Sequence, residues 1–319
     1  QLVRLRKDLM RAKLYALFLT FLAGISSAQE LDNEVRIGVL AKRGSEQCLQ
    51  QWAPTAEYLS THVADHRFQI VPIPFDEVYH KAETASVEYV LANPAMYVAL
   101  ERWHGATRIA TLRNRRVGLA VTQFGGVIFC HAHTPGITSF ENLEGKRFAA
   151  VDPDSFGGWI MARREFEARG IDPDKDFAAL TFEGTHDAVV HAVLEGRADA
   201  GTVRTDTLEL MALEGKINTE ELKVIESRRE LDPDFPFDHS TRLYPEWPIS
   251  RLPHASEHLA EQVAAALYTM PHEHPAAQAA QCLGWTIPLN YQPVHECLRE
   301  LRIGAYADYG KFSIGDVVR

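Results

Sequence analysis

Residues 151–169 read VDPDSFGGWIMARREFEAR, a stretch with the pattern of a strand end, a tight turn and a helix. Ser155 stands at the expected N-cap position, and Gly157 and Gly158 fall in the first turn of the helix. Free N–H groups at a helix start, beside glycines that allow close approach to the backbone, are suited to holding an anion. An ordinary strand-to-helix turn has the same pattern. A second copy, EGTHD at residues 183–187, favours the binding site.

Strand and helix patterns alternate along the chain on both sides of this stretch, which predicts an α/β fold. The predicted strands lie at residues 35–40, 68–72, 87–92, 109–112, 148–151, 179–182 and 199–203, and the predicted helices at residues 45–62, 75–83, 155–169, 186–195, 256–270 and 293–301. Residues 117–130 and 233–248 have the pattern of two crossovers between lobes. We therefore predict a bilobal clam-shell, with lobe I at residues 35–123 and 243–319 and lobe II at residues 124–242.

The N-terminus has the features of an export signal. Basic residues precede an apolar run at residues 14–25, and Ser26, Ser27 and Ala28 follow it. This order is typical of a secretory signal peptide, and the run is shorter than the roughly 18 residues that span a bilayer. We expect cleavage after Ala28, with an uncleaved membrane anchor as the alternative. The body of the chain is therefore predicted to be periplasmic or extracytoplasmic, tethered to the inner membrane in a full-length protein.

The composition is that of a soluble globular protein. The chain has 319 residues, of which 46% are hydrophobic and 24% charged, enough for about two domains. The net charge of −10 makes nucleic acid a poor partner. The four cysteines show no CxxC spacing, which argues against zinc and iron–sulfur sites. One or two disulfides could form in an exported protein, and Cys282 and Cys297 are the nearest pair in sequence.

Patterns of catalytic chemistry are weak in this chain. The His-x-His pairs at residues 131–133 and 272–274 lack a third ligand at a diagnostic spacing, so we predict no metal site. Residues 238–240 read Asp-His-Ser, but adjacent residues cannot usually adopt the geometry of a catalytic triad. Neither a phosphate loop nor a Rossmann glycine fingerprint occurs. We therefore predict a binding protein with no catalytic residues and no cofactor.

Several strings carry a family resemblance. RIGVLAKRGSEQCLQQWAPTAEYLS at residues 36–60, FGGWIMARREFEARGIDPDKDF at 156–177 and THDAVVHAVLEGRADAGTVRTDTLE at 185–209 resemble the phosphonate-type periplasmic solute-binding family. HSTRLYPEWP at 239–248 and GWTIPLNYQPVHECLRELRIGAY at 284–306 are similar to the extracytoplasmic sensor region of membrane histidine kinases of the tetrathionate-sensor type. The resemblance implies a bilobal type II periplasmic-binding-protein fold, with the ligand held between the lobes and closure as the signal.

The resemblance also implies which segments face the cleft. They are the helix start from Asn93 to Tyr97, the turns at residues 155–158 and 184–186, and Asp199. The family usually has a hydroxyl-rich turn after the DPDS stretch, whereas this chain has Phe-Gly-Gly, which argues against phosphonate itself as the ligand. Helix N-termini attract negative charge, and three arginines near predicted strand ends are candidate counter-charges, so we expect a small anion. The candidate ligand-binding residues are Arg43, Asn93, Tyr97, Ser155, Phe156, Gly157, Gly158, Thr185, His186, Asp199, Arg204 and Arg242.

Three functions from different classes follow from these features, and the third, an enzyme built on the same clam-shell, would need a nucleophile or an acid pair in the cleft, which the sequence does not show. The first is the sensor domain of a two-component membrane histidine kinase, homodimeric in the full-length receptor, whose closure passes through the C-terminal segment to the membrane. The second is the free periplasmic substrate-binding component of an ABC importer for phosphonate-like or other oxyanion solutes. An apolar span encoded after Arg319 would favour the sensor. In either case we expect hinges at residues 124–127 and 238–242, where Gly125 and Gly126 tolerate a large backbone change.

Overall fold

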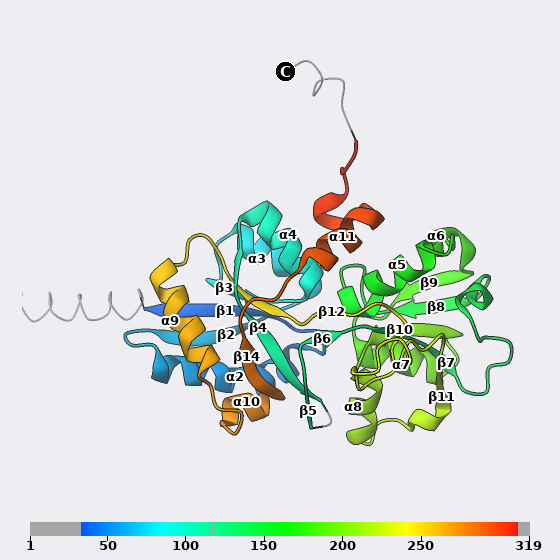
Figure 1. The fold of residues 1–319 in the computed structure, drawn as a ribbon, viewed down its shortest axis with the longest axis horizontal. Coiled ribbons are helices and arrows are strands. Elements are labelled where there is room, and N and C mark those ends of the chain that lie inside the picture. Colours follow the sequence, from blue (N-terminus) through cyan, green and yellow to red (C-terminus); the bar gives the residue numbers. More distant parts are fainter. Residues whose placement is uncertain (1–32, 117, 312–319) are drawn as a thin grey trace, which may run out of the picture.

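The computed structural model describes residues 33–116 and 118–311 as two lobes, each built on its own β-sheet (Figure 1). The predicted export signal lies outside the described residues. None of the helices in the described part combines the length and the apolar character that a bilayer crossing requires.

Lobe I holds a seven-stranded sheet in the order β14-β4-β13-β3-β1-β2, with β5 paired to β4. The strands are β1 Glu34–Leu40, β2 Arg67–Ile73, β3 Tyr89–Leu91, β4 Thr107–Arg116, β5 Leu119–Val121, β13 Pro248–Arg251 and β14 Cys282–Thr286. The helices are α2 Ser45–His62, α3 Val78–Glu83, α4 Pro94–His104, α9 Glu257–Tyr268, α10 Pro275–Ala279 and α11 Gln292–Leu301. β1 pairs in parallel with β2 and β3, as a βαβ series predicts. The strands beyond β3 run antiparallel.

Lobe II holds a five-stranded sheet in the order β11-β7-β10-β8-β9. The strands are β7 Gly126–His131, β8 Arg147–Ala150, β9 Ala179–Phe182, β10 Ala200–Arg204 and β11 Leu222–Val224. The helices are α5 Met161–Glu167, α6 Pro173–Asp176, α7 His186–Leu194 and α8 Thr207–Leu213. β8 pairs in parallel with β9 and β10, whereas β7 and β11 complete the sheet as antiparallel strands. The predicted α/β architecture of two lobes is confirmed.

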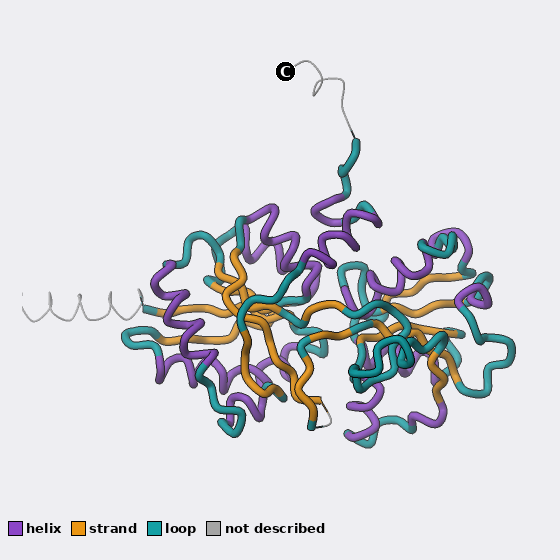
Figure 2. Tube along the Cα trace, in the orientation of Figure 1, coloured by secondary structure: helices purple, strands orange, loops and turns teal. Residues whose placement is uncertain are grey.

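Two short strands connect the lobes. β6 Gln123–Phe124 and β12 Tyr244–Pro245 pair antiparallel with each other and belong to neither large sheet. Figure 2 shows both strands in the narrow middle of the molecule, where the chain passes between the lobes. The predicted first crossover at residues 117–130 was too long. Its two ends belong to the sheets, in β5 of lobe I and β7 of lobe II.

The predicted hinge glycines serve close packing in this structure. Neither Gly125 nor Gly126 has a positive φ. A Cβ on Gly126 would lie 3.0 Å from the Thr241 Cγ2 atom and 3.3 Å from the Gly157 carbonyl oxygen. The two crossing segments and the turn of lobe II therefore meet backbone to backbone at this point, and hinge motion itself stays a prediction.

Two local details differ from expectation, although the predicted helix is present and Ser155 stands at its N-cap position. The helix expected at residues 155–169 begins with a π-helical turn, Phe156–Ile160, before α5, and Ser155 makes no side-chain capping hydrogen bond. Cys282 and Cys297 do not pair, because all four cysteines are buried and free. Cys282 lies in β14 and Cys297 in α11, so each is fixed within a different element of the apolar core.

Candidate functional site

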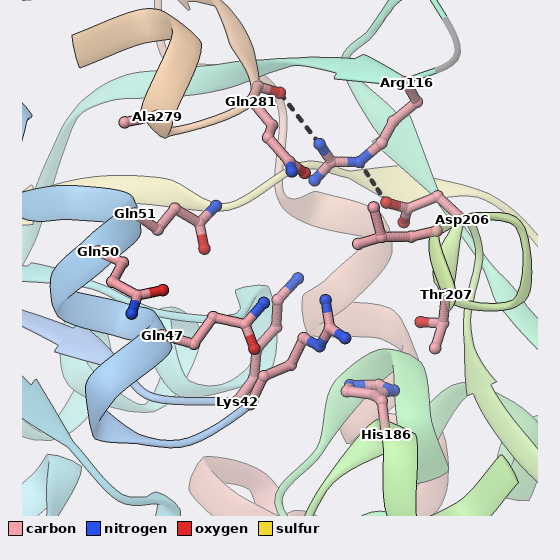
Figure 3. A pocket seen from close by; sticks show the side chains of 12 residues that line it. Lys42, Gln47, Gln50, Gln51, Arg116, His186, Asp206, Thr207, Ala279 and Gln281 are labelled. Atoms are coloured by element: carbon pink, nitrogen blue, oxygen red, sulfur yellow. Dashed lines mark hydrogen bonds and ion pairs between the residues drawn. The ribbon is translucent and has the colours of Figure 1, made fainter. Parts of the chain in front are cut away.

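A cavity of about 170 Å³ lies between the two lobes. Its walls come from α2, the end of β4 and the α10–β14 connection in lobe I, and from the starts of α7 and α8 in lobe II (Figure 3). The lining residues are predominantly polar or charged: Lys42, Arg43, Gln47, Gln50, Gln51, Arg116, His186, Asp206, Thr207, Leu210, Ala279 and Gln281. A cavity of this composition suits a small polar solute.

A smaller chamber of about 30 Å³ shares five of these residues and is here called the inner chamber. The shared residues are Lys42, Arg43, Gln47, Gln51 and Arg116. Its further walls include Asn114 of β4, Arg204 of β10 and the ring of Trp247. The two cavities thus adjoin, and the inner chamber reaches toward the crossover strands.

The local sequence explains why Lys42 stands at this edge. β1 ends at Leu40, and the chain turns through Gly44, whose φ is 95°, before α2 begins at Ser45. The side chain of Lys42 is therefore placed just beyond the carboxyl end of a parallel strand, where α/β proteins bind their ligands. Gln47 and Gln51 follow at helical spacing on one face of α2.

A buried charge network forms the floor of the site. The Arg204 guanidinium donates to Asp206 at 3.1 Å and to Glu246 at 2.7 Å. Arg116 reaches Asp206 from lobe I, and it also donates to the Gln281 carbonyl oxygen at 3.0 Å. Burial alone would raise the pKa of Asp206, but Arg116, Arg204 and Lys42 together hold it below its usual range. Asp206 is therefore ionised, and both carboxylates are occupied by arginines.

Lys42 differs from these arginines because it has no hydrogen-bonding or ion-pair partner for its ammonium among the described residues. Its Nζ lies 5.2 Å from the centre of the Trp247 ring, a cation–π distance. Burial, and next the charge of Arg204, hold the pKa of Lys42 well below its usual range. The site thus keeps a lysine whose charge lacks a carboxylate.

His186 enters the cavity as a neutral imidazole. The side chain is 4% exposed, and burial followed by the charge of Lys42 holds its pKa well below the usual range. Its Nδ1 accepts the backbone N–H of Arg204 at 3.3 Å. His186 can therefore donate through Nε2 without adding charge.

Arg43 links the two lobes at the rim of the cavity. From lobe I it contacts Asp187 at 2.6 Å and Glu214 at 2.9 Å, both in lobe II. Lys216 contacts the same two carboxylates. The rim is therefore a set of two cations and two carboxylates that balance each other.

The structure brings only part of the predicted set together. Arg43, His186 and Arg204 line the cavities. Thr185 caps α7 by accepting the Ala188 N–H, and Gly157 packs against Arg204, since a Cβ there would lie 2.8 Å from the Arg204 Cβ.

The other predicted residues do not line these cavities and have partners elsewhere. Asn93 caps α4 and donates to the Asp154 carbonyl oxygen, and Tyr97 binds Glu101 and Arg108. Phe156 packs on Phe124 and Tyr244. Asp199 pairs with Arg147, and Arg242 with Glu165. Ser155 and Gly158 are buried at the turn itself, where a Cβ on Gly158 would meet the Ser155 Oγ.

Sequence reasoning missed Lys42, Asn114, Arg116 and Trp247. Lys42 could have been found, because it precedes Arg43 at the end of a predicted strand. The other three depend on strand pairing across the sheet of lobe I, for which the sequence offers no local signal. No group of metal-binding side chains occurs in the described residues.

Comparisons with known proteins agree with this geometry. Residues 37–290 match the family model of the periplasmic phosphonate substrate-binding proteins of ABC transporters. The chain is 32% identical over 267 residues to the tetrathionate sensor histidine kinase TtrS of Salmonella typhimurium, covering 83% of this chain and 43% of that protein. It therefore spans less than half the length of that relative.

Solved structures of low identity share the fold. PhnD1 of Prochlorococcus marinus, in complex with methylphosphonate, has a TM-score of 0.67 at 14% identity, covering 85% of this chain and 98% of that one. A binding-protein component of an ABC phosphonate transporter from Pseudomonas aeruginosa has a TM-score of 0.68 at 15% identity, covering 89% and 92%. The type II periplasmic-binding-protein fold is confirmed. Together with the two-lobed architecture, the family match shows that the chain belongs to the phosphonate-type periplasmic substrate-binding proteins, a family of binding proteins rather than enzymes.

Proposed function

We propose that this chain is the ligand-binding sensor domain of a membrane histidine kinase, which holds a small anion between its lobes and signals by closure. The observation that carries the proposal is Lys42, a cation in the inter-lobe cavity with no carboxylate of its own. The alternative is a free substrate-binding component of an ABC importer, which the family description supports.

The charges around the cavity favour an anion. When Lys42 is protonated, Lys42, Arg116 and Arg204 face only two carboxylates, Asp206 and Glu246, so the cluster then has one positive charge in excess. The neighbouring Arg204 disfavours the charge on Lys42, and a bound anion would supply the opposite charge that the lysine lacks. Donors from Gln47, Gln51 and neutral His186 surround the same space and can bind oxygen atoms without cancelling the charge.

The size of the cavity favours a small solute. About 170 Å³ and an adjoining 30 Å³ hold a few non-hydrogen atoms rather than a nucleotide or a peptide. The named relatives act on sulfur or phosphorus oxyanions: one senses tetrathionate and another was solved with methylphosphonate. We therefore expect a sulfur or phosphorus oxyanion, and sulfur oxyanions are the first choice because the more similar relative is a tetrathionate sensor.

Closure is supported by ion pairs that join the lobes. Arg43 of lobe I binds Asp187 and Glu214 of lobe II, and Arg116 of lobe I binds Asp206. A ligand shifts the lobes toward closure only if it binds the closed form more tightly. A cavity lined from both lobes meets that condition, because opening would remove the contacts from one of the lobes.

A route to the membrane is supported by α11, which packs on α4 of lobe I and on α5 of lobe II. Figure 1 shows α11 between the lobes, as the last long helix before the C-terminal end of the described chain. Arg164 of α5 binds Glu300 of α11 through two contacts, at 2.8 and 2.7 Å, and donates to the Tyr244 hydroxyl of the crossover. Lobe motion would therefore displace the C-terminal helix, which favours the sensor over the importer component.

Calorimetric titration of the purified chain tests the proposal. We expect binding of thiosulfate, tetrathionate or methylphosphonate, and a loss of about 10- to 100-fold in affinity for Lys42→Met, because a charged hydrogen bond is removed. Lys175→Met is the matched control, since Lys175 is 79% exposed and pairs with Asp172 on the surface of lobe II. Binding of neutral or cationic solutes alone would contradict the proposal.

A further inference from the structure

Asn114 is a buried amide without a partner at the inner end of the site. The side chain is 1% exposed, and both its Nδ2 and its Oδ1 lack a hydrogen bond within the described part of the chain. It lines the inner chamber together with Lys42, Arg204 and Trp247. The lining of the inner chamber thus includes this amide, the unpaired ammonium, an arginine held by carboxylates, and the Trp247 ring.

The register of β4 explains its orientation. Side chains alternate along a strand, so Leu112, Asn114 and Arg116 share one face, and all three line the inner chamber. Leu112 on this face is buried and apolar, as a core position requires. An apolar residue at position 114 would continue that pattern, and an asparagine there breaks it.

A buried amide without hydrogen-bonding partners lowers the stability of the folded protein. Natural structures satisfy nearly all buried polar side chains, and each exception calls for an explanation. Leaving such a group unpaired costs more than replacing it by an apolar side chain of similar shape. Asn114 therefore lowers the stability of the ligand-free protein. Residues that lower stability in this way are expected at binding sites.

We propose that Asn114 is a specificity-determining residue of the site, whose Nδ2 donates to an oxygen of the bound oxyanion while its Oδ1 accepts from the Lys42 ammonium. This inference rests on the proposed function, and it defines the ligand more narrowly. The ligand must present an oxygen atom at the inner end of the cavity, so a sulfur or phosphorus oxyanion is bound and a halide is not. Lys42 supplies the positive charge, and Asn114 donates a hydrogen bond to the ligand oxygen.

Two variants of the purified chain test this role. Asn114→Leu keeps the number and branching of the side-chain heavy atoms and removes the amide, so the ligand-free protein should melt about 2 °C or more higher, while its affinity for thiosulfate or methylphosphonate falls about 10-fold. Asn114→Asp gives Lys42 a carboxylate, so it should also melt higher when empty and should lose oxyanion binding altogether. Chloride should bind neither the wild type nor the variants.

The control is Asn93, a buried asparagine whose amide is satisfied on both sides. Its Oδ1 accepts the Met96 N–H and its Nδ2 donates to the Asp154 carbonyl oxygen, so Asn93→Leu should lower the melting temperature of the ligand-free protein. If Asn114→Leu also lowers or leaves unchanged that temperature, or binds oxyanions as tightly as the wild type, the role of Asn114 is overturned. Absence of oxyanion binding in the wild type would instead overturn the proposed function, and a higher melting temperature of empty Asn114→Leu would still show the cost of the amide.

Discussion

The turn from β8 into α5 and the turn from β9 into α7 both place glycine beside a hydroxyl residue at a helix start, and they fold in different ways. In the first, Gly157 and Gly158 are buried in a π-helical turn, and Ser155 makes no capping hydrogen bond. In the second, Gly184 has a φ of 80° with open space around it, and Thr185 caps α7. The first turn contacts lobe I, where Asn93 donates to the Asp154 carbonyl oxygen, whereas the second presents His186 to the cavity.

The comparison teaches that a glycine at a helix start has two separate uses. Gly158 makes room for Val151, since a Cβ would lie 2.4 Å from the Val151 Cγ2 atom. Gly184 instead supplies a left-handed backbone that other residues rarely adopt. Only the second kind of turn leaves a capped helix start facing the candidate site, so the two turns are expected to respond differently to the same substitutions.

The largest difference is expected when asparagine replaces each glycine. Asparagine tolerates a positive φ, so Gly184→Asn should change the free energy of unfolding by less than about 0.5 kcal/mol. Gly158→Asn must displace Val151 and Ser155 and should cost about 3 kcal/mol. Urea unfolding of both variants measures this, and equal losses would show that the two glycines have the same use.

A smaller difference is expected in the dependence of stability on pH. The pKa of His186 is held well below its usual range by burial, so below about pH 6.5 the unfolded chain binds a proton that the folded chain does not. Stability should therefore fall by about 1.4 kcal/mol as the pH drops from 7.5 to 5.5. His186→Gln, which keeps an acceptor for the Arg204 N–H, should remove this loss.

The first turn should respond to pH with the opposite sign. Burial raises the pKa of Asp152 and Asp154, so the folded chain holds their protons more tightly than the unfolded chain, and their contribution to stability falls as the pH rises. Asp154→Asn should therefore leave the loss of stability between pH 7.5 and 5.5 in place or enlarge it. If this variant removed the loss, the titrating group would not be His186.

The smallest difference is expected at the two hydroxyl residues. Thr185→Ala removes the cap of α7 and should cost about 1 kcal/mol, because the Ala188 N–H loses its acceptor. Ser155→Ala removes no capping bond and should cost less than half as much. The same urea titration compares them, and a larger loss at Ser155 would assign it a role that its hydrogen bonds do not explain.

Much of the fold could be predicted from the sequence. The predicted strand at residues 179–182 and the predicted helix at 45–62 coincide with β9 and α2. The helix start at Asn93 and Pro94 and the start of α7 after Thr185 were also expected. These features depend on side-chain periodicity and on hydrogen bonds to a backbone only a few residues away, so the sequence contains what determines them.

The interior of the candidate site was decided by tertiary structure. Arg43 and Arg204 were singled out as candidate counter-charges for the ligand, but the fold gives each of them carboxylate partners, two of which stand 144 and 42 residues away in sequence. Lys42 became the unpaired cation because those arginines occupy the nearby carboxylates. Asn114 reached the inner chamber through pairing of β4 with β5 and β14. Sequence determines which side chains can carry charge, and only long-range packing decides which of them are left without a partner, because burial and charge pairing depend on neighbours distant in the chain.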